Sequence, residues 1–303
     1  MKKRGIILLS IPLILLLIFF FLFYGPIESF RLMWINTAIY SARHKFLAEF
    51  FYSDEYIAEV LARNNIHASA ITNESDLAEY WDDEILFAEL RGNYYRGYIV
   101  RINDPRRLVF VQSETEEGNL LEHFTEKYGA QGGINASGYL DPFMRGLVFG
   151  ITVLDGEFLS GEFSDRAHNI GGFRDDHKFI VGSFYKENFN EASFLWALEF
   201  GPVLIVNGGK TDLTPYSGGL APRTAMGQTE EGHVLLVVID GRQAGSLGAT
   251  FLDLQNILYA NGAVNAINLD GGSSSSMVYQ GQLVNNPSDG SRERLLPNAI
   301  LFR

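Results

Sequence analysis

The feature that most constrains this chain is an uncharged apolar stretch at its N-terminus. Lys2, Lys3 and Arg4 precede twenty residues, from Gly5 to Tyr24, that contain no charged side chain. At a rise of about 1.5 Å per residue, a helix of this length covers about 30 Å, the thickness of the hydrocarbon layer of a bilayer. The basic residues favour a cytoplasmic N-terminus. The sequence therefore predicts a cell-membrane protein with one span and its remaining residues outside the cytoplasm.

A cleaved signal peptide is the alternative interpretation of this stretch. Its apolar core is usually shorter, at about 7–15 residues, and it ends at an Ala-x-Ala-like site. The residues after Tyr24 read Gly-Pro-Ile-Glu and offer no such site. This favours an anchor that is retained.

Charge and cysteine content exclude several classes of function. The chain of 303 residues has 24 Lys and Arg against 36 Asp and Glu, and no cysteine. Without Lys2, Lys3 and Arg4, 21 basic residues remain against 36 acidic ones, so the external part carries about −15. This acidity argues against a nucleic-acid partner. The absence of cysteine excludes a disulfide scaffold, a Cys-ligated metal and a thiol nucleophile, and we expect neither a metal nor a cofactor.

Hydrophobic patterning divides the rest of the chain into two parts. Helical spacing is present over 30–51 and, after a capping Ser53, over 54–64, and a polar stretch follows to about residue 83. Short β runs begin at Ile85. We therefore expect a basic tip and anchor over 1–24, a helical stalk and linker over 25–84, and a domain over 85–303.

The C-terminal domain is expected to be α+β, with a mixed β-sheet core and flanking helices. Its clearest unit is strand–helix–strand: apolar runs over 233–240 and 263–269 both end in Asp-Gly and enclose a helix over 250–260. Further strands are expected over 85–89, 94–102, 107–112, 146–154, 157–160, 169–173, 178–182, 202–207, 276–279, 282–284 and 298–302, with helices over 120–128 and 190–199.

Four glycine-rich polar segments lie beside these strands, over 132–137, 206–210, 222–227 and 268–276. Glycine lets backbone N–H groups approach an anion, and ligands of sheet proteins bind at strand ends. The run Gly208-Gly209-Lys210-Thr211 is not a P-loop, because that motif requires glycine where Leu204 stands. Asp270, which ends a buried strand and precedes two glycines, is expected at the mouth of a site.

Arginine is the second indication of an anion site. No lysine follows Lys210, although five arginines do. Arginine holds phosphate through two hydrogen bonds, which lysine does not. Arg223, within one of the glycine-rich segments, is the candidate, and a surface ion pair is the alternative for this residue.

The same segments carry a resemblance to a known family. The runs Pro222-Arg-Thr-Ala-Met-Gly227, Val238-Ile-Asp-Gly-Arg242, Asn268-Leu-Asp-Gly-Gly-Ser-Ser-Ser275 and Val284-Asn-Asn-Pro-Ser-Asp-Gly290, with Arg292, occur in this order. From about Ile85 to Arg303 the chain resembles the phosphodiester glycosidase family. Many relatives have Asn-Gly-Gly-Phe-Phe where this chain has Asn135-Ala-Ser-Gly-Tyr139, so the sugar preference does not carry over.

The resemblance implies hydrolysis of a sugar-1-phosphodiester by C–O cleavage, giving a free sugar and a phosphomonoester. It points to Asp270 as the catalytic carboxylate and to Arg223 as the phosphate ligand, helped by the Gly271–Ser273 backbone and hydroxyls. Asp240 is either a second carboxylate or the Asp of a tight turn. The further substrate-binding candidates are Asn135, Asn207, Thr224, Gly271, Gly272, Ser273, Asn285 and Arg292. The three asparagines among them are expected either to bind sugar hydroxyls or to shape the loops.

The expected substrate is a phosphodiester-linked glycan of the cell surface, such as an exopolysaccharide or a teichoic-acid-like polymer. Two alternatives remain at this point. The same loops suit a non-catalytic glycan-binding or exopolysaccharide assembly factor. A metal-dependent phosphodiesterase that cleaves P–O is less well supported, because only Asp240, Asp270 and scattered histidines are available as ligands.

Overall fold

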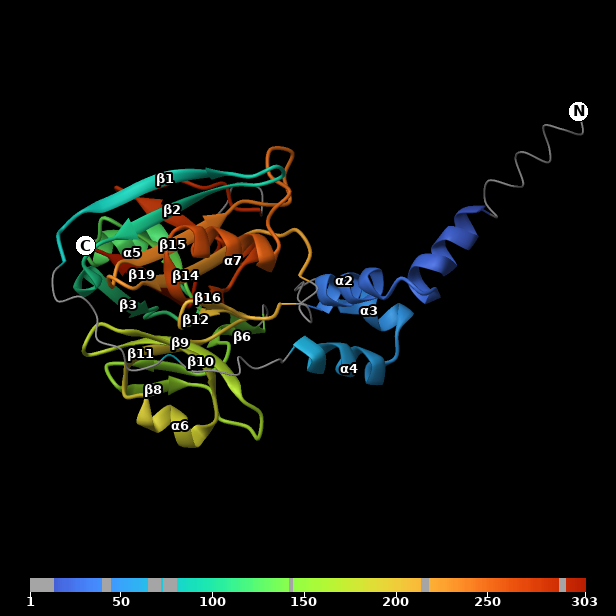
Figure 1. Cartoon of the computed structure of the whole chain (residues 1–303), viewed down its shortest axis with the longest axis horizontal. Helices are drawn as coiled ribbons and strands as arrows, with labels where there is room; N and C mark the ends of the chain where they lie inside the picture. Colours follow the sequence, from blue (N-terminus) through green and yellow to red (C-terminus); the bar gives the residue numbers. More distant parts are fainter. Residues whose placement is uncertain are drawn as a thin grey trace, which may run out of the picture. The chain divides into compact units, whose positions relative to one another are not determined.

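A computed structural model describes residues 14–39, 45–64, 72, 81–141, 144–213, 218–288 and 293–303 (Figure 1). The chain divides into two compact units. The N-terminal unit comprises Met1–Ile66 with Thr214–Gly219, and the C-terminal unit comprises His67–Leu213 with Leu220–Arg303. The C-terminal unit thus begins earlier than the expected boundary at residue 85.

The N-terminal unit is helical, as its sequence predicts. Residues 14–24 are helical, and α2 (Glu28–Ile39), α3 (Lys45–Phe51) and α4 (Asp54–Asn64) follow. The ring centroid of Phe23 lies 4.5 Å from that of Phe51 and 4.9 Å from that of Trp34. Among the described residues, no helix has both the length and the apolar character needed to cross a membrane. The first nine residues of the expected span, 5–13, lie outside the described residues.

The C-terminal unit is built mainly of three sheets. The first has the order β1 (Ile85–Arg91), β2 (Arg96–Ile102), β15 (Val234–Ile239), β14 (Arg223–Thr229), β16 (Ala263–Leu269), β12 (Val203–Val206), β13 (Gly209–Lys210). The second has the order β18 (Gln282–Leu283), β17 (Met277–Tyr279), β4 (Gly132–Asn135), β19 (Asn298–Phe302), β3 (Leu108–Gln112). The third has the order β10 (Phe179–Phe184), β9 (His168–Arg174), β11 (Phe194–Glu199), β7 (Thr152–Leu154), β8 (Glu157–Ser160), and β5 (Tyr139–Asp141) pairs with β6 (Met144–Val148).

Strand direction differs from the expected mixed sheet. Every pairing among the described strands is antiparallel. The strand–helix–strand unit does give two strands of the same direction, β15 and β16, but β14 lies between them and pairs with both. The α+β class is confirmed, and the sheets are antiparallel.

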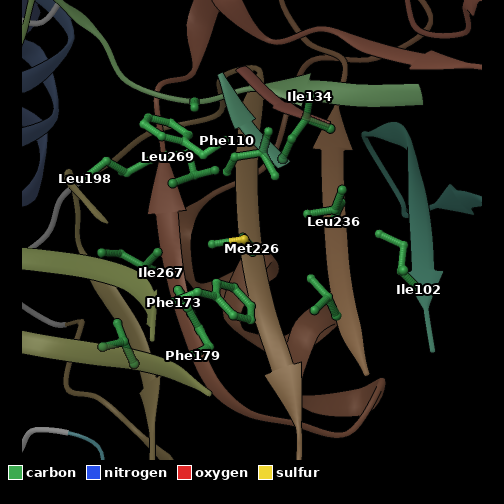
Figure 2. Close-up of a cluster of buried hydrophobic side chains, with 14 of the residues drawn as sticks. Ile102, Phe110, Ile134, Phe173, Phe179, Leu198, Met226, Leu236, Ile267 and Leu269 are labelled. Carbon is green, nitrogen blue, oxygen red and sulfur yellow. The ribbon is translucent and has the colours of Figure 1, made fainter. Parts of the chain in front are cut away.

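The three sheets share one hydrophobic core (Figure 2). Met226 and Ile267 come from the first sheet, Ile134 from the second, and Phe173 and Phe179 from the third, and all are buried. At about 25 cal/mol per Å² of apolar area buried, such a shared core is the main stabilising contribution of the unit. It fixes the ends of strands from different sheets relative to one another, which a binding site requires.

Short helices cover the outer faces of the sheets. α7 (Phe251–Ala260) packs on the first sheet, α5 (Leu121–Lys127) on the second and α6 (Lys186–Glu191) on the third. The apolar run of β15 is explained by this arrangement, because alternate residues enter different cores. Leu236 faces the shared core and Leu235 faces α7. Two 3₁₀ turns, Pro105–Arg107 and Gly272–Ser274, complete the elements.

Several predicted elements need correction. Residues 194–199, expected to be helical, form strand β11 between β9 and β7. Alanine, leucine and glutamate in this segment favour a helix, but pairing on both edges and burial of Trp196 and Leu198 outweigh that preference. The expected strand over 146–154 is divided between β6 and β7, with Gly150 at a φ of 73° between them.

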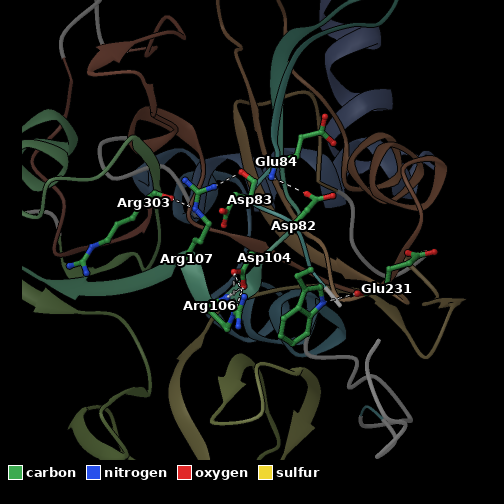
Figure 3. A network of polar contacts seen from close by, with 9 residues as sticks. Asp82, Asp83, Glu84, Asp104, Arg106, Arg107, Glu231 and Arg303 are labelled. Atoms are coloured by element: carbon green, nitrogen blue, oxygen red, sulfur yellow. Dashed lines mark hydrogen bonds and ion pairs between the residues drawn. The ribbon is translucent and has the colours of Figure 1, made fainter. Parts of the chain in front are cut away.

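Residues 81–84, expected to belong to the linker, are bound to the C-terminal unit (Figure 3). The indole Nε1 of Trp81 donates to the carbonyl of Glu231 at 2.9 Å. Asp82 accepts from the side chain of Asn103 at 2.7 Å, and Arg107 donates to the carbonyl of Asp83 at 2.5 Å. This segment is therefore part of the folded domain.

Candidate functional site

The antiparallel order of the first sheet brings three predicted site segments to one edge. Thr224 is paired with Leu269, and Arg223 with Ile239. The beginning of β14 therefore lies beside the ends of β15 and β16, after which Asp240 and Asp270 follow in the chain. These strand ends form the candidate site.

Asn135 connects this edge to the second sheet. Its side chain is fully buried, and its Nδ2 donates to the backbone carbonyl of Asp270 at 2.6 Å. Its Oδ1 accepts from the Thr224 hydroxyl at 2.8 Å and from the Ser276 amide at 3.1 Å. Both Asn135 and Thr224 have no exposed surface. They hold the Asp270 loop in place, and a direct contact of Asn135 with the sugar stays a prediction.

Asp270 is the carboxylate at the centre of the site. Burial raises the pKa of its carboxyl to about 6, although the Ser274 hydroxyl, the charge of Arg294 and the Gly271 amide each lower it. The backbone N–H of Asp270 donates to the carbonyl of Ala136 at 3.1 Å. The result is a carboxyl that is held in a fixed position and that ionises close to neutral pH.

Two glycines make the tight turn after Asp270 possible. A Cβ atom on Gly271 would lie 2.8 Å from the carbonyl oxygen of Pro222. Gly272 has a φ of 63°, and its N–H donates to the same carbonyl at 3.0 Å. A side chain at Gly271 would therefore force the backbone apart, and one at Gly272 would be strained.

Arg294 and Arg242 lie beside this turn, and Arg223 lies close enough to Arg242 for their charges to interact. Arg294 donates from Nη1 to the Ser273 hydroxyl at 3.3 Å. Nη1 of Arg242 lies 3.5 Å from the Cβ position of Gly272. The guanidinium of Arg223 packs 3.9 Å above the ring of Phe251.

The arginines are close enough to interact unfavourably with one another. Burial, together with the smaller effect of the Arg242 charge, lowers the pKa of Arg223 to about 10. Burial also lowers the pKa of Arg242. Placing two cations together costs free energy that a bound anion offsets, so this arrangement is typical of a phosphate site.

Sequence reasoning placed neither Arg242 nor Arg294 in the site, although signals for both were present. Arg242 belongs to the Asp-Gly-Arg run, and Arg294 is one of the arginines in the lysine-free C-terminal third. Tyr139, also unassigned, stacks with Arg294 at 4.9 Å and donates from its hydroxyl to the carbonyl of Leu295. Burial raises the pKa of the Tyr139 hydroxyl to about 12, so it is a neutral donor at physiological pH.

Asp240 and Asn285 lie at the same edge. Asp240 Oδ1 accepts from the Asn285 side chain at 3.1 Å and from the Asn286 amide at 2.9 Å. Burial raises the pKa of Asp240, while these two hydrogen bonds lower it. Asn285 also donates to the Ser275 carbonyl at 2.9 Å. Asp240 therefore connects the strand end to the segment after β18, and a role as a second carboxylate stays a prediction.

The remaining predicted site residues are placed differently. Asn207 is exposed in the turn between β12 and β13, with a φ of 51°. Gly208, the next residue, donates to Val264 near the start of β16, so this turn is at the other end of the strand from Asp270. The structure does not bring Asn207 into the site. Arg292 lies outside the described residues. Within the described part, no three His, Asp or Glu side chains gather as metal ligands.

Comparison with solved structures first defines the class of fold. The catalytic domain of the zebrafish N-acetylglucosamine-1-phosphodiester alpha-N-acetylglucosaminidase superposes with a TM-score of 0.62 at 18% sequence identity. The match covers 83% of this chain and 94% of that domain. A hypothetical protein from Synechocystis gives a TM-score of 0.50 at 19% identity, over 72% of this chain and 61% of that one. The C-terminal unit thus has the sheet-rich fold of these proteins.

Sequence comparison then gives the family. The phosphodiester glycosidase model matches residues 128–303, more than half of the chain. The mouse N-acetylglucosamine-1-phosphodiester alpha-N-acetylglucosaminidase is 25% identical over an alignment of 231 residues that covers 69% of this chain and 44% of the mouse protein. The SPbeta prophage-derived uncharacterized protein YomE of Bacillus subtilis is 41% identical over 69 residues, 23% of this chain and 11% of YomE. The chain belongs to the phosphodiester glycosidase family, as its motifs predict, and covers less than half the length of these relatives.

Proposed function

We propose that the C-terminal unit hydrolyses a sugar-1-phosphodiester at the C–O bond, releasing a sugar with a free anomeric hydroxyl and a phosphomonoester. The observation that supports this most strongly is the position of Asp270. Its carboxyl has a pKa of about 6, follows a buried strand and adjoins a glycine turn that has Arg242 and Arg294 beside it. Family membership supports the same class of reaction.

The chemistry follows from the charges that develop in this reaction. As the C–O bond breaks, positive charge develops at the anomeric carbon and negative charge on the departing phosphate. An ionised Asp270 stabilises the first, either directly or by activating the attacking water. Arg223, Arg242 and Arg294 stabilise the second. Since phosphate departs as a stable anion, protonation of the leaving group contributes less than in ordinary glycosidases.

The reaction is tested with a sugar-1-phosphodiester in ¹⁸O-labelled water. We expect the label in the sugar, because water attacks carbon; label in the phosphate means P–O cleavage and contradicts the mechanism. Absence of any released reducing sugar would favour the alternative of a non-catalytic glycan-binding factor.

The role of Asp270 has its own test. Asp270→Asn is expected to lower kcat/KM by about 10²-fold or more, because it removes the negative charge while keeping the shape. In the wild type, kcat/KM is expected to rise as pH increases through about 6, because the carboxylate is the active form. A folded Asn variant with unchanged turnover would show that the assignment is wrong.

The role of Arg223 is tested by comparing two substrates. Arg223→Ala is expected to weaken use of a phosphodiester much more than use of an aryl glycoside of the same sugar, because only the first carries a phosphate. An equal loss with both substrates would exclude a specific phosphate contact.

We also propose that an N-terminal helix anchors the chain in the cell membrane, with the C-terminal unit outside the cytoplasm acting on surface polysaccharide or teichoic-acid-like material. Residues 14–24 are helical and carry exposed apolar side chains, including Leu15 and Leu17, after the basic N-terminal tip. The test is protease treatment of intact cells. Digestion of the C-terminal unit is expected, and protection of the unit in intact cells with digestion after lysis would contradict this topology.

A further inference from the structure

An aromatic pair lies beside the Asp270 carboxyl and takes no part in the chemistry proposed above. The Cβ position of Gly138 lies 3.1 Å from the ring of Phe200 and 3.5 Å from Cγ of Asp270. Phe149 meets Phe200 edge to face, with 6.1 Å between ring centroids and 70° between ring planes. The backbone N–H of Phe149 donates to the Gly138 carbonyl at 2.8 Å, which fixes its position beside the site.

The two rings differ in their surroundings. Phe200 is partly buried and packs against the shared core, which holds it in place. Phe149 leaves 38% of its surface exposed. A Cβ atom at Gly138 would be tight against the Phe200 ring and in ordinary van der Waals contact with the Asp270 carboxyl, so the ring and the carboxyl face the same point. An exposed aromatic ring is common on protein surfaces, but one that extends a rigid apolar wall up to a buried carboxyl is typical of a ligand site.

Two kinds of surface therefore meet at Asp270. The turn after Asp270 is polar and cationic, with Arg242 at Gly272 and Arg294 at Ser273. The surface next to Gly138 is apolar and aromatic, formed by Phe149 and Phe200. A sugar-1-phosphate has the same two parts, because its phosphate is anionic and one face of its ring presents C–H groups that pack on aromatic rings.

We propose that Phe149 and Phe200 bind the sugar ring of the substrate, so that its anomeric carbon lies at Asp270 and its phosphate is directed to the arginines. This inference rests on the proposed function and adds to it the orientation of the substrate and its class. The class is a pyranosyl phosphodiester with an unsubstituted apolar ring face. Phe149 is the residue that determines how tightly the sugar is bound.

The test measures binding without turnover. The full chain is purified in a detergent that has no sugar headgroup, and saturation-transfer NMR follows binding of the α-1-phosphates of glucose, galactose and N-acetylglucosamine, each added separately. Phosphorus NMR follows binding of inorganic phosphate, which lacks the sugar. We expect at least one sugar phosphate to bind, with the strongest transfer to its ring C–H protons.

Three variants test whether Phe149 is responsible. Phe149→Ala is expected to raise the Kd for that sugar phosphate five- to twentyfold while changing the Kd for inorganic phosphate less than twofold. Phe149→Tyr keeps the aromatic ring, so its Kd values for the sugar phosphate and for inorganic phosphate are both expected to stay within twofold of those of the wild type. The matched control is Phe158→Ala, since Phe158 is 49% exposed and lies in β8, where it contacts Phe163 and Phe189.

The inference is wrong if none of the three sugar phosphates binds to the wild type, or if Phe149→Ala binds the sugar phosphate as tightly as the wild type does. It is also wrong if Phe149→Ala raises the Kd for inorganic phosphate as much as the Kd for the sugar phosphate. Failure of the proposed function gives a different result. If the wild type binds the sugar through Phe149 but releases no reducing sugar from phosphodiesters, the sugar-binding role of Phe149 and Phe200 stands and the proposed hydrolase activity is wrong.

Discussion

At the scale of single residues, the ionisation of Asp270 links activity to stability. Its folded pKa of about 6 lies above the ordinary value, so the folded chain keeps a proton that the unfolded chain releases between about pH 4 and 6. The free energy of unfolding therefore falls as pH rises through this window. Asp270→Asn is expected to be more stable than the wild type by about 2 kcal/mol above pH 6, with the difference disappearing near pH 4.

Urea unfolding of both chains at pH 4 and pH 8 measures this difference. Asp155→Asn is the matched control, since Asp155 is exposed in the turn between β7 and β8 and has a φ of 53°, which asparagine also accepts. The free energy of unfolding of Asp155→Asn, relative to the wild type, should be the same at pH 4 and at pH 8. A gain of the same size in both variants would show that the burial of Asp270 is not its cause.

Replacing Asn135, at the same site, is expected to lower the stability of the fold considerably. Its amide makes three hydrogen bonds, to Asp270, Thr224 and Ser276, and is fully buried. Asn135→Ala leaves buried partners without hydrogen bonds, so we expect a loss of about 3 kcal/mol in the free energy of unfolding, measured by urea denaturation. Asn261→Ala removes one exposed amide bond, to Ile257, and is expected to cost less than about 1 kcal/mol. Equal losses would contradict the bridging role of Asn135.

At the scale of secondary structure, α7 begins as the sequence predicts. The Thr250 hydroxyl accepts from the Asp253 amide at 3.1 Å, and the Asp253 carboxylate accepts from the Thr250 amide at 2.9 Å. This is a reciprocal N-terminal cap. Thr250→Ala is expected to lower the free energy of unfolding by about 1 kcal/mol. Thr250→Ser keeps a capping hydroxyl and is expected to lose much less. A Ser variant as unstable as the Ala variant would show that the hydroxyl is not responsible.

The accuracy of the sequence predictions follows from how each element is stabilised. Strand β15 is a continuous apolar run, and helix α7 is capped by Thr250 and Asp253 at its own start. Both signals are local, so the sequence predicts both elements. Strands β4 and β14 were predicted only as glycine-rich segments, because Gly132–Asn135 and Arg223–Thr229 combine glycine with polar residues. These polar residues bond to other elements, as Thr224 does to Asn135. Their strand structure depends on tertiary contacts that a local pattern does not record.

The same distinction applies to the site. Asp270 and Arg223 were predictable from motif and position, and the structure places them at one edge of a sheet. The aromatic pair was not predictable. Phe149 and Phe200 are 51 positions apart in the sequence, and they meet through tertiary folding, with the Phe149 amide bonded to Gly138 and the Phe200 ring close to the same glycine.

At the scale of the whole molecule, a residue before position 85 joins the first sheet to the third. The Thr72 amide donates to the Val181 carbonyl at 3.1 Å, and the Val181 amide donates to the Thr72 hydroxyl at 3.0 Å. The Thr72 hydroxyl also donates to Asn265 Oδ1 at 3.1 Å. Since Val181 lies in β10 and Asn265 in β16, Thr72 joins the third sheet to the first.

A chain that begins at residue 85 is therefore expected to be less stable than one that begins at residue 67. It loses these three hydrogen bonds of Thr72 and those that Trp81, Asp82 and Asp83 make with Glu231, Asn103 and Arg107. At about 0.5–1.5 kcal/mol each, these six hydrogen bonds amount to about 5 kcal/mol. Urea unfolding of the two truncated chains measures the difference. Thr72→Ala in the longer chain should reproduce only part of the loss, because it removes the two of these hydrogen bonds that the hydroxyl makes and keeps that of the backbone amide. Equal stability of the two truncated chains would place the domain boundary at residue 85, and residues 67–84 would then be a linker, as their polar composition suggests.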